Sequence, residues 1–107
     1  IPLLVTFPIN RWTLSNKDRV NLGFLAEALK ANPKLVYSVS GYADKGTGSA
    51  KRNIFLARKR AEVVYNCLVN EFGVSESQLK KDSHGGVANM YYNDPRCSRS
   101  VLSKVAE

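Results

Sequence analysis

One charged side chain lies where the sequence otherwise predicts a core. Residues 52–72 have the spacing of a long helix, and its apolar arc is formed by Ala57, Ala61, Val64 and Leu68. Arg60 falls at the edge of this arc, one turn from Leu56. A guanidinium in such a position is costly unless its charge is paired. The sequence therefore indicates a polar partner for Arg60.

The acid nearest in the chain to this helix's start is Asp44, in a glycine-rich stretch at 41–48 that we expect to be a loop. The loop can carry Asp44 to the N-terminal half of the helix, so two interpretations are open. In one, Asp44 and Arg60 form a buried salt bridge that only fixes the loop. In the other, they face one shallow ligand site. Spacing alone does not choose between them.

The first half of the chain predicts a strand, a helix and a second strand. Residues 3–7 form a short apolar run typical of a strand. Ser15 and Asp18 have the spacing of a capping box, and the helix that follows carries Leu22, Leu25, Ala26 and Leu29 on one face. Asn32 and Pro33 end it. Residues 35–40 alternate as a strand does, with Leu35, Tyr37 and Val39 on its more apolar side.

The second half adds the long helix and two more strands. Gly73 is expected to end the helix at 52–72 in a left-handed conformation. Residues 79–83 form a weak strand candidate, residues 85–95 are rich in turn formers, and residues 98–105 form a last strand, edge-like by its Ser and Lys content. The order β-α-β-α-β-β indicates helices packed on one sheet, within a single domain over residues 1–107.

Composition restricts the class of protein without selecting a partner. The chain of 107 residues is 44% hydrophobic and 23% charged, as in an ordinary globular domain, and its net charge of +7 favours acidic partners such as nucleic acid, anionic lipid or an acidic polymer. Its apolar runs are far shorter than a membrane-spanning helix needs. The abrupt start at Ile1 suggests a fragment of a longer precursor. Cys67 is expected to be a small core residue, whereas Cys97 is left open.

Catalysis, metal binding and nucleotide binding find no support in the residue pattern. His84 is the single histidine and has no nucleophile or metal-ligand set at a suggestive spacing, so we expect solvated surface. Residues 46–51 lack the full phosphate-loop pattern. The basic residues Lys51, Arg52, Arg58 and Lys59 cluster without a recognised nucleic-acid module, and a solvated helix face is the simpler interpretation. We therefore expect no enzyme, no cofactor and no metal.

Two segments together resemble a family signature. Val39-Ser40-Gly41-Tyr42-Ala43-Asp44 is followed after a glycine-containing loop by Asn53-Ile54-Phe55-Leu56-Ala57-Arg58-Lys59-Arg60-Ala61-Glu62-Val63-Val64. This resembles the G-[HY]-[TA]-D and N-x-x-L-[SA]-x-x-R-A-x-x-V signature of OmpA-like domains, in a form common in Bacteroidetes proteins. The resemblance extends over nearly the whole chain. It implies an α+β sandwich in which two main helices pack on one small mixed sheet.

The resemblance also implies a ligand and the residues that hold it. OmpA-like domains bind the diaminopimelate of the peptidoglycan stem peptide non-covalently. Asp44 is then expected to meet the ammonium of its side-chain centre and Arg60 the carboxylate, while Asn10, Asn53, Leu56 and Arg99 surround the pocket. Simpler roles stay open: Leu56 as plain core, Asn53 as the helix N-cap, and Arg99 as a charge on an edge strand. Asn10 rests on the resemblance alone.

Three departures from the family pattern concern the rim of this pocket. The usual N-R-R-V is Ser98-Arg99-Ser100-Val101 here. An aspartate common near the end of the first strand is replaced by Pro8 or Asn10, depending on alignment, and the commonest threonine before the signature aspartate is Ala43. These changes keep the Asp44 and Arg60 pair and alter its surroundings.

The expected function is to attach an envelope protein to the cell wall. The resemblance implies a location at the periplasmic face of the bacterial outer membrane, with membrane attachment through parts of the protein outside this chain. Peptidoglycan is the expected partner and nucleic acid is not. The alternatives are a structural or interaction domain of the same fold that has lost ligand binding, and a module that adheres to nucleic acid or lipid by charge.

Overall fold

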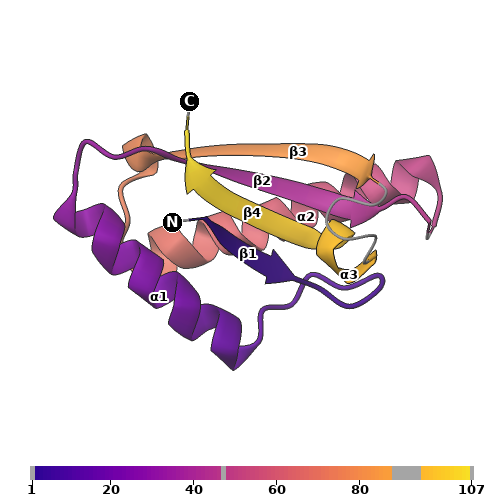
Figure 1. Ribbon diagram of the computed structural model, residues 1–107, viewed down its shortest axis with the longest axis horizontal. Helices are drawn as coiled ribbons and strands as arrows, with labels where there is room; N and C mark the ends of the chain where they lie inside the picture. Colours follow the sequence, from indigo (N-terminus) through magenta and orange to yellow (C-terminus); the bar gives the residue numbers. More distant parts are fainter. Residues whose placement is uncertain (1, 47, 88–94, 107) are drawn as a thin grey trace.

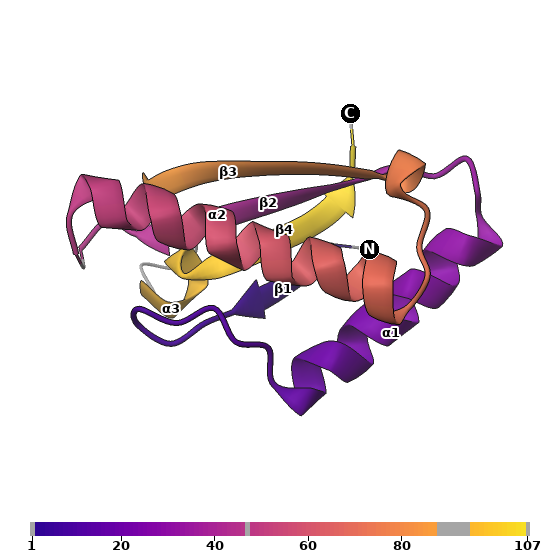
Figure 2. The same ribbon diagram turned by 180° about the vertical axis from the view of Figure 1, so that it is seen from behind.

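The chain folds into a four-stranded sheet with its two long helices packed against one face (Figures 1 and 2). The computed structural model describes residues 2–46, 48–87 and 95–106. The strands are β1 (Leu3–Thr6), β2 (Tyr37–Asp44), β3 (Leu79–Val87) and β4 (Ser100–Val105). The two main helices and the mixed sheet confirm the α+β class predicted from the sequence.

The first helix, α1 (Asn16–Ala31), begins and ends where the sequence predicts. Ser15 caps it, its side chain accepts from the Asp18 N–H, and the Asp18 carboxylate accepts from the Ser15 N–H, which completes the capping box. Its buried residues are Leu22, Leu25, Ala26 and Leu29, the face that the periodicity indicated. Asn32 caps the other end.

The second long helix, α2 (Ala50–Asn66), starts two residues before the predicted position and continues as a π-helical segment at Cys67–Glu71. Ser49 is its N-cap and accepts from the Arg52 N–H. Gly73 leaves the helix with a φ of 72°, as the C-terminal glycine rule predicts. The interpretation of Asn53 as the N-cap is therefore wrong.

The sheet order is β1-β4-β2-β3, so the last strand lies in the middle and not at an edge. β4 pairs antiparallel with both β1 and β2, and β2 pairs parallel with β3. The predicted edge position failed because serine is polar yet small: Ser100 and Ser103 are fully buried in this middle strand. The strand also starts two residues late, after the short helix α3 (Pro95–Ser98).

Two predicted loops are partly strand. Residues 41–44 belong to β2, and β3 runs past residue 83 to Val87, after a 3₁₀ turn at Glu76–Gln78. A Cβ built on Gly41 would lie 2.1 Å from the Ala57 carbonyl oxygen, so α2 approaches β2 closely only because this residue is glycine. The rest of the turn-rich stretch, residues 88–94, lies outside the described residues.

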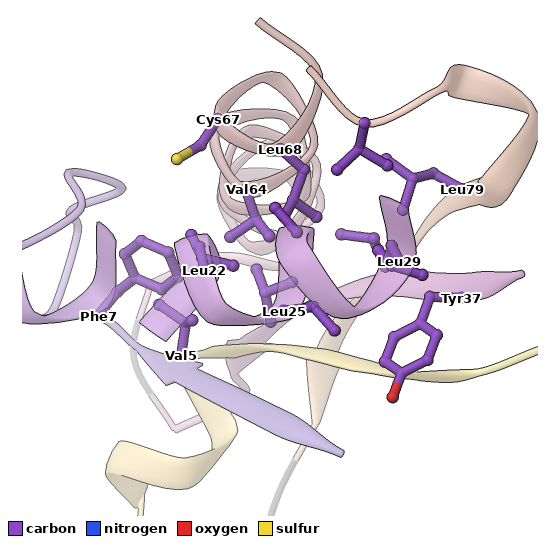
Figure 3. Close-up of a cluster of buried hydrophobic side chains, with 14 residues drawn as sticks. Val5, Phe7, Leu22, Leu25, Leu29, Tyr37, Val64, Cys67, Leu68 and Leu79 are labelled. Carbon is purple, nitrogen blue, oxygen red and sulfur yellow. The ribbon is translucent and has the colours of Figure 1, made fainter. Parts of the chain in front are cut away.

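The main core lies between α1, the C-terminal half of α2 and the inner face of the sheet (Figure 3). Leu22 and Leu29 of α1 meet Val64 and Leu68 of α2 over the strands (Figure 3). Cys67 is buried at its margin, as predicted, and its sulfur points away from the leucines. Cys67 and the half-buried Cys97 are both free thiols.

Candidate ligand-binding site

A second, smaller cluster lies at the opposite end of the sheet, where polar groups replace hydrocarbon. Here the end of β2, the start of α2 and the chain before β4 come together, beside α3 (Figure 1). Ala43, Leu56 and Ala57 form its apolar part, with Trp12 packed against them. Asp44, Arg60 and Arg99 supply its charges.

Asp44 ends β2, and its two carboxylate oxygens face different groups. One oxygen, Oδ1, accepts from the Gly46 N–H at 3.0 Å, which turns the chain toward α2. The other, Oδ2, lies 3.5 Å from Nη1 of Arg99. The two side chains are only 11% and 12% exposed, so this ion pair is poorly screened by solvent. The expected Asp44 and Arg60 salt bridge is thus replaced by a pair with Arg99.

Arg60 is held by backbone carbonyls. Its side chain is fully buried, and its Nε donates to the Arg11 carbonyl at 2.9 Å. Nη1 donates to the Tyr42 carbonyl at 3.1 Å, and Nη2 to the Pro8 carbonyl at 3.2 Å. The guanidinium therefore joins β2 to the segment that follows β1. One N–H on each terminal nitrogen has no acceptor among the described residues.

Burial and a like charge act on Arg60 together. The pKa of Arg60 is lowered to about 10, first by burial and then by the charge of Arg99, while Asp44 opposes the shift. Arg60 stays charged at neutral pH. Among the described residues the site thus holds two guanidinium groups around one carboxylate, an excess of positive charge suited to an incoming carboxylate.

Arg99 lies just before β4 and not on an edge strand. Its Nε donates to the Phe7 carbonyl at 3.0 Å, and the Phe7 N–H donates back to the Arg99 carbonyl at 2.7 Å. These bonds fix the end of β1 beside the ion pair with Asp44. The side chain of Arg99 is 12% exposed, so it lies closer to solvent than that of Arg60, which is fully buried.

Asn53 presents a buried acceptor that nothing described satisfies. Its side chain is 3% exposed, and its Oδ1 has no hydrogen-bond partner in the described part of the chain. It lines a hollow of about 410 Å³ whose rim includes Lys45, Ile54 and His84. A buried carbonyl oxygen without a donor is costly, so this atom is suited to accept from a ligand N–H.

Leu56 and Asn10 differ from the other predicted residues. Leu56 is 4% exposed and packs in the small apolar cluster, in agreement with the plain-core interpretation. Asn10 is exposed, has a φ of 59°, and accepts from Nε of Arg52 at 2.9 Å. Its side chain is therefore tied to the outer flank of α2.

Two surface arrangements were missed in the sequence. The basic cluster surrounds an aromatic ring: Arg52, Arg58 and Lys59 all lie within 6 Å of the Phe55 ring centre. His84 is exposed as predicted, but its ring stacks on Tyr42 with centres 4.9 Å apart. The three basic residues stand three or four positions from Phe55, a helical spacing that could have predicted the first arrangement. Tyr42 and His84 are distant in the sequence, so no local signal marked the second.

Within the described residues, no group of three or more His, Cys, Asp or Glu side chains could hold a metal ion. The helices in that part of the chain are also too short or too polar to cross a membrane.

Comparison with solved structures identifies the fold class. The peptidoglycan-associated lipoprotein from Burkholderia pseudomallei is 24% identical, with a TM-score of 0.78 over 96% of this chain and 87% of that chain. The C-terminal domain of MotB from Helicobacter pylori is 23% identical, with a TM-score of 0.78 over 95% of this chain and 82% of that one. The OmpA-like domain of FopA1 from Francisella tularensis is 20% identical, with a TM-score of 0.77 over 99% and 75%. The fold is that of OmpA-like domains.

The chain belongs to the OmpA family, whose model matches residues 6–101. Outer membrane protein 40 of Porphyromonas gingivalis is 31% identical over 104 residues, which are 97% of this chain and 27% of that protein. The chain thus spans about a quarter of the length of this curated relative. The predicted family is confirmed.

Proposed function

We propose that this domain binds peptidoglycan non-covalently through the diaminopimelate of its stem peptide. Family membership and the likeness to a peptidoglycan-associated lipoprotein support the proposal. The observation that carries it is the arrangement of Asp44 with Arg99 and the buried Arg60, together with the unsatisfied Oδ1 of Asn53 in the first turn of α2. Nothing in this arrangement requires chemistry on the ligand, so we propose binding without catalysis.

The head of diaminopimelate carries an ammonium and a carboxylate on one carbon. Asp44 accepts from the ammonium, and Arg60 offers the carboxylate its two remaining N–H groups. Because Arg60 is buried, we place the ligand's entrance beside Arg99, which supplies a second guanidinium there. Asn53 accepts from a further ligand N–H. Leu56 and Asn10 support this site from the core and from the rim.

This arrangement predicts selectivity between wall types. Lysine-type peptidoglycan has the amine without the carboxylate. Its binding leaves the two guanidinium groups without the anion that balances them, at a cost of about 1–3 kcal/mol, or tenfold and more in affinity. We therefore expect preference for diaminopimelate-type wall.

Co-sedimentation with purified sacculi of both types, at moderate salt, tests the proposal. Asp44→Asn keeps the shape of the side chain and Arg99→Gln replaces the guanidinium with a shorter neutral amide, and both are expected to abolish binding to diaminopimelate-type wall. Arg60→Lys is preferable to Arg60→Ala, because alanine leaves three buried carbonyls without a donor. Matched charge controls are Glu27→Gln and Arg58→Gln, which change exposed residues of α1 and α2.

Equal sedimentation with both walls, unaffected by these variants and removed by salt, would show that the net charge of +7 alone causes adhesion. That result contradicts the proposed site.

A second candidate is a structural domain of the same fold without a ligand. The ion pair of Asp44 with Arg99 and the three carbonyls around Arg60 favour it, because these charges already have partners. This candidate predicts no sedimentation with either wall and a lower melting temperature for every site variant.

We further propose a location at the periplasmic face of the outer membrane, with attachment through parts of the protein outside this chain. The 31% identity to an outer membrane protein supports this location.

A further inference from the structure

A second hollow lies on the flank of α2, away from the acid and guanidinium cluster. It has a volume of about 420 Å³ and is bounded by the segment before α1, the start of α1 and the C-terminal part of α2 with its π-helical turn. Its lining includes Trp12, Arg19, Val63, Asn66, Asn70 and Glu71. We call it the Trp12 hollow.

The Trp12 hollow combines a flat apolar surface with planar polar groups. The half-buried indole of Trp12 and Val63 provide the apolar surface, and the exposed amides of Asn66 and Asn70 provide donors and acceptors. Arg19 and Glu71 form an ion pair at the margin. A sugar ring has matching features, because its C–H faces are apolar and its hydroxyl and acetamido groups point outward in the ring plane.

The described side chains of this hollow are suited to binding and do not include an activated nucleophile. The thiol of Cys67 also lines it, but the pKa of Cys67 is raised to about 11, first by burial and then by a hydrogen bond with Glu71. A neutral thiol is a poor nucleophile. The same hydrogen bond, together with the one from Arg19, lowers the pKa of Glu71 and keeps it an anionic acceptor.

The position of the hollow fits a ligand that extends from the proposed site. Trp12 follows Arg11, whose carbonyl accepts from Arg60, so one segment forms a wall of both places. Asn66 lies six residues beyond Arg60, which is a rise of about 9 Å along the axis of α2 and about a third of a turn around it. In the wall polymer, two residues and a lactyl group connect diaminopimelate to the sugar, a span of about 10 Å when extended.

We propose that the Trp12 hollow binds an N-acetylated amino sugar of the glycan strand that carries the bound stem peptide. The proposal rests on the proposed function, because the stem peptide determines which sugar can reach the hollow. Trp12 stacks on the sugar ring, and Asn66 and Asn70 hydrogen-bond its acetamido and hydroxyl groups.

Calorimetric titration with three probes tests this inference: the free tripeptide Ala-Glu-diaminopimelate, the same tripeptide on its disaccharide, and the disaccharide alone. The parent is expected to bind the disaccharide–tripeptide about five- to tenfold more tightly than the free tripeptide, the effect of one or two added hydrogen bonds. In the double variant Asn66→Ala/Asn70→Ala this ratio falls to about one, while affinity for the free tripeptide is unchanged. Both amides are exposed, so the fold is expected to remain intact.

Trp12 gives an independent signal because it is the only tryptophan in the sequence. Its fluorescence should shift and its acrylamide quenching should fall on adding the disaccharide–tripeptide, and this protection should be weaker in the double variant. Asn21→Ala, an asparagine of α1 beside a different hollow, is the matched control and keeps the full ratio.

A ratio of one in the parent, or a ratio that survives in the double variant, overturns the inference while the peptide site stands. Binding of the disaccharide–tripeptide that needs Asn66 and Asn70, with no measurable binding of the free tripeptide, overturns the diaminopimelate site and keeps the sugar site. No binding of any probe overturns both.

Discussion

Around Leu29 and Leu68 the helices and the sheet meet mainly through hydrocarbon, although the buried amide of Gln78 donates to the Leu29 carbonyl. Around Asp44 and Arg60 the same layers meet through charges and backbone carbonyls. The first region gains stability from every buried side chain. The second loses part of that gain to the desolvation of two guanidinium groups and a carboxylate. The comparison teaches that one end of the domain stabilises the fold, and that the other holds buried charges at the site proposed for a ligand.

The largest expected effect comes from the hydrocarbon end. Leu68→Ala removes a fully buried side chain and should lower the free energy of unfolding by about 2–5 kcal/mol. Urea denaturation measures this change. Wall binding by the remaining folded protein should be unaffected, and a loss of binding at full occupancy of the folded state would show that the two ends are not independent.

A smaller loss of stability should accompany a larger loss of binding at the charged end. Gly41→Ala places a Cβ against the Ala57 carbonyl oxygen, so α2 must move away from β2. We expect a destabilisation of about 1–3 kcal/mol. Because Asn53 and Arg60 move with α2, affinity for the stem peptide should fall more than in Leu68→Ala. Unchanged affinity would show that the site tolerates this shift.

Alkaline pH should reveal the buried thiol at the margin of the main core. The pKa of Cys67 is raised from 9.0 to about 11, so the unfolded chain loses this proton first. The contribution of the neutral thiol to the free energy of unfolding is fully present below pH 9. It is lost as the pH rises to 11, and the loss is at most about 2–3 kcal/mol. Cys67→Ala should therefore show a shallower decline in stability over this interval. Equal declines in the parent and in Cys67→Ala would contradict the raised pKa of Cys67.

The helix caps offer the smallest contrast. Ser15→Ala at the start of α1 breaks a complete capping box, and Ser49→Ala at the start of α2 breaks a single bond to the Arg52 N–H. Both should cost about 1 kcal/mol, and Ser15→Ala should cost more. Thermal denaturation of the two variants provides the test. A larger effect at Ser49 would show that α2 depends more on its single cap bond than α1 depends on its capping box.

Local signals predicted the helices well and the sheet poorly. The Ser15 and Asp18 pair, the leucine periodicity and Gly73 mark features that neighbouring residues determine, and each has the predicted role. The central place of β4 depends on pairings between residues about a hundred positions apart, such as Leu3 with Ser103. Nothing within the strand itself specifies such a partner.

The site was predicted in part for a similar reason. The helical spacing placed Arg60 at the edge of the apolar arc, and the structure buries its side chain. Its partners are carbonyls of Pro8, Arg11 and Tyr42, which carry no side-chain signature. The ion pair of Asp44 likewise goes to Arg99, which directly precedes a strand whose position was predicted wrongly. The ligand roles of these residues stay predictions.

The antiparallel pairing of β1 with β4 has a mechanical consequence. Leu3 pairs with Ser103 at one end of the ladder and Thr6 with Ser100 at the other, the end next to Arg99. Tension applied at Leu3 and balanced by a wall fragment held at Asp44 would pull β1 along its own axis, so its bonds to β4 would bear the load together. Tension between Leu3 and Val105 would instead peel the strands apart one pair at a time. A domain loaded through its bound wall should therefore withstand a larger force than the same domain stretched by its ends.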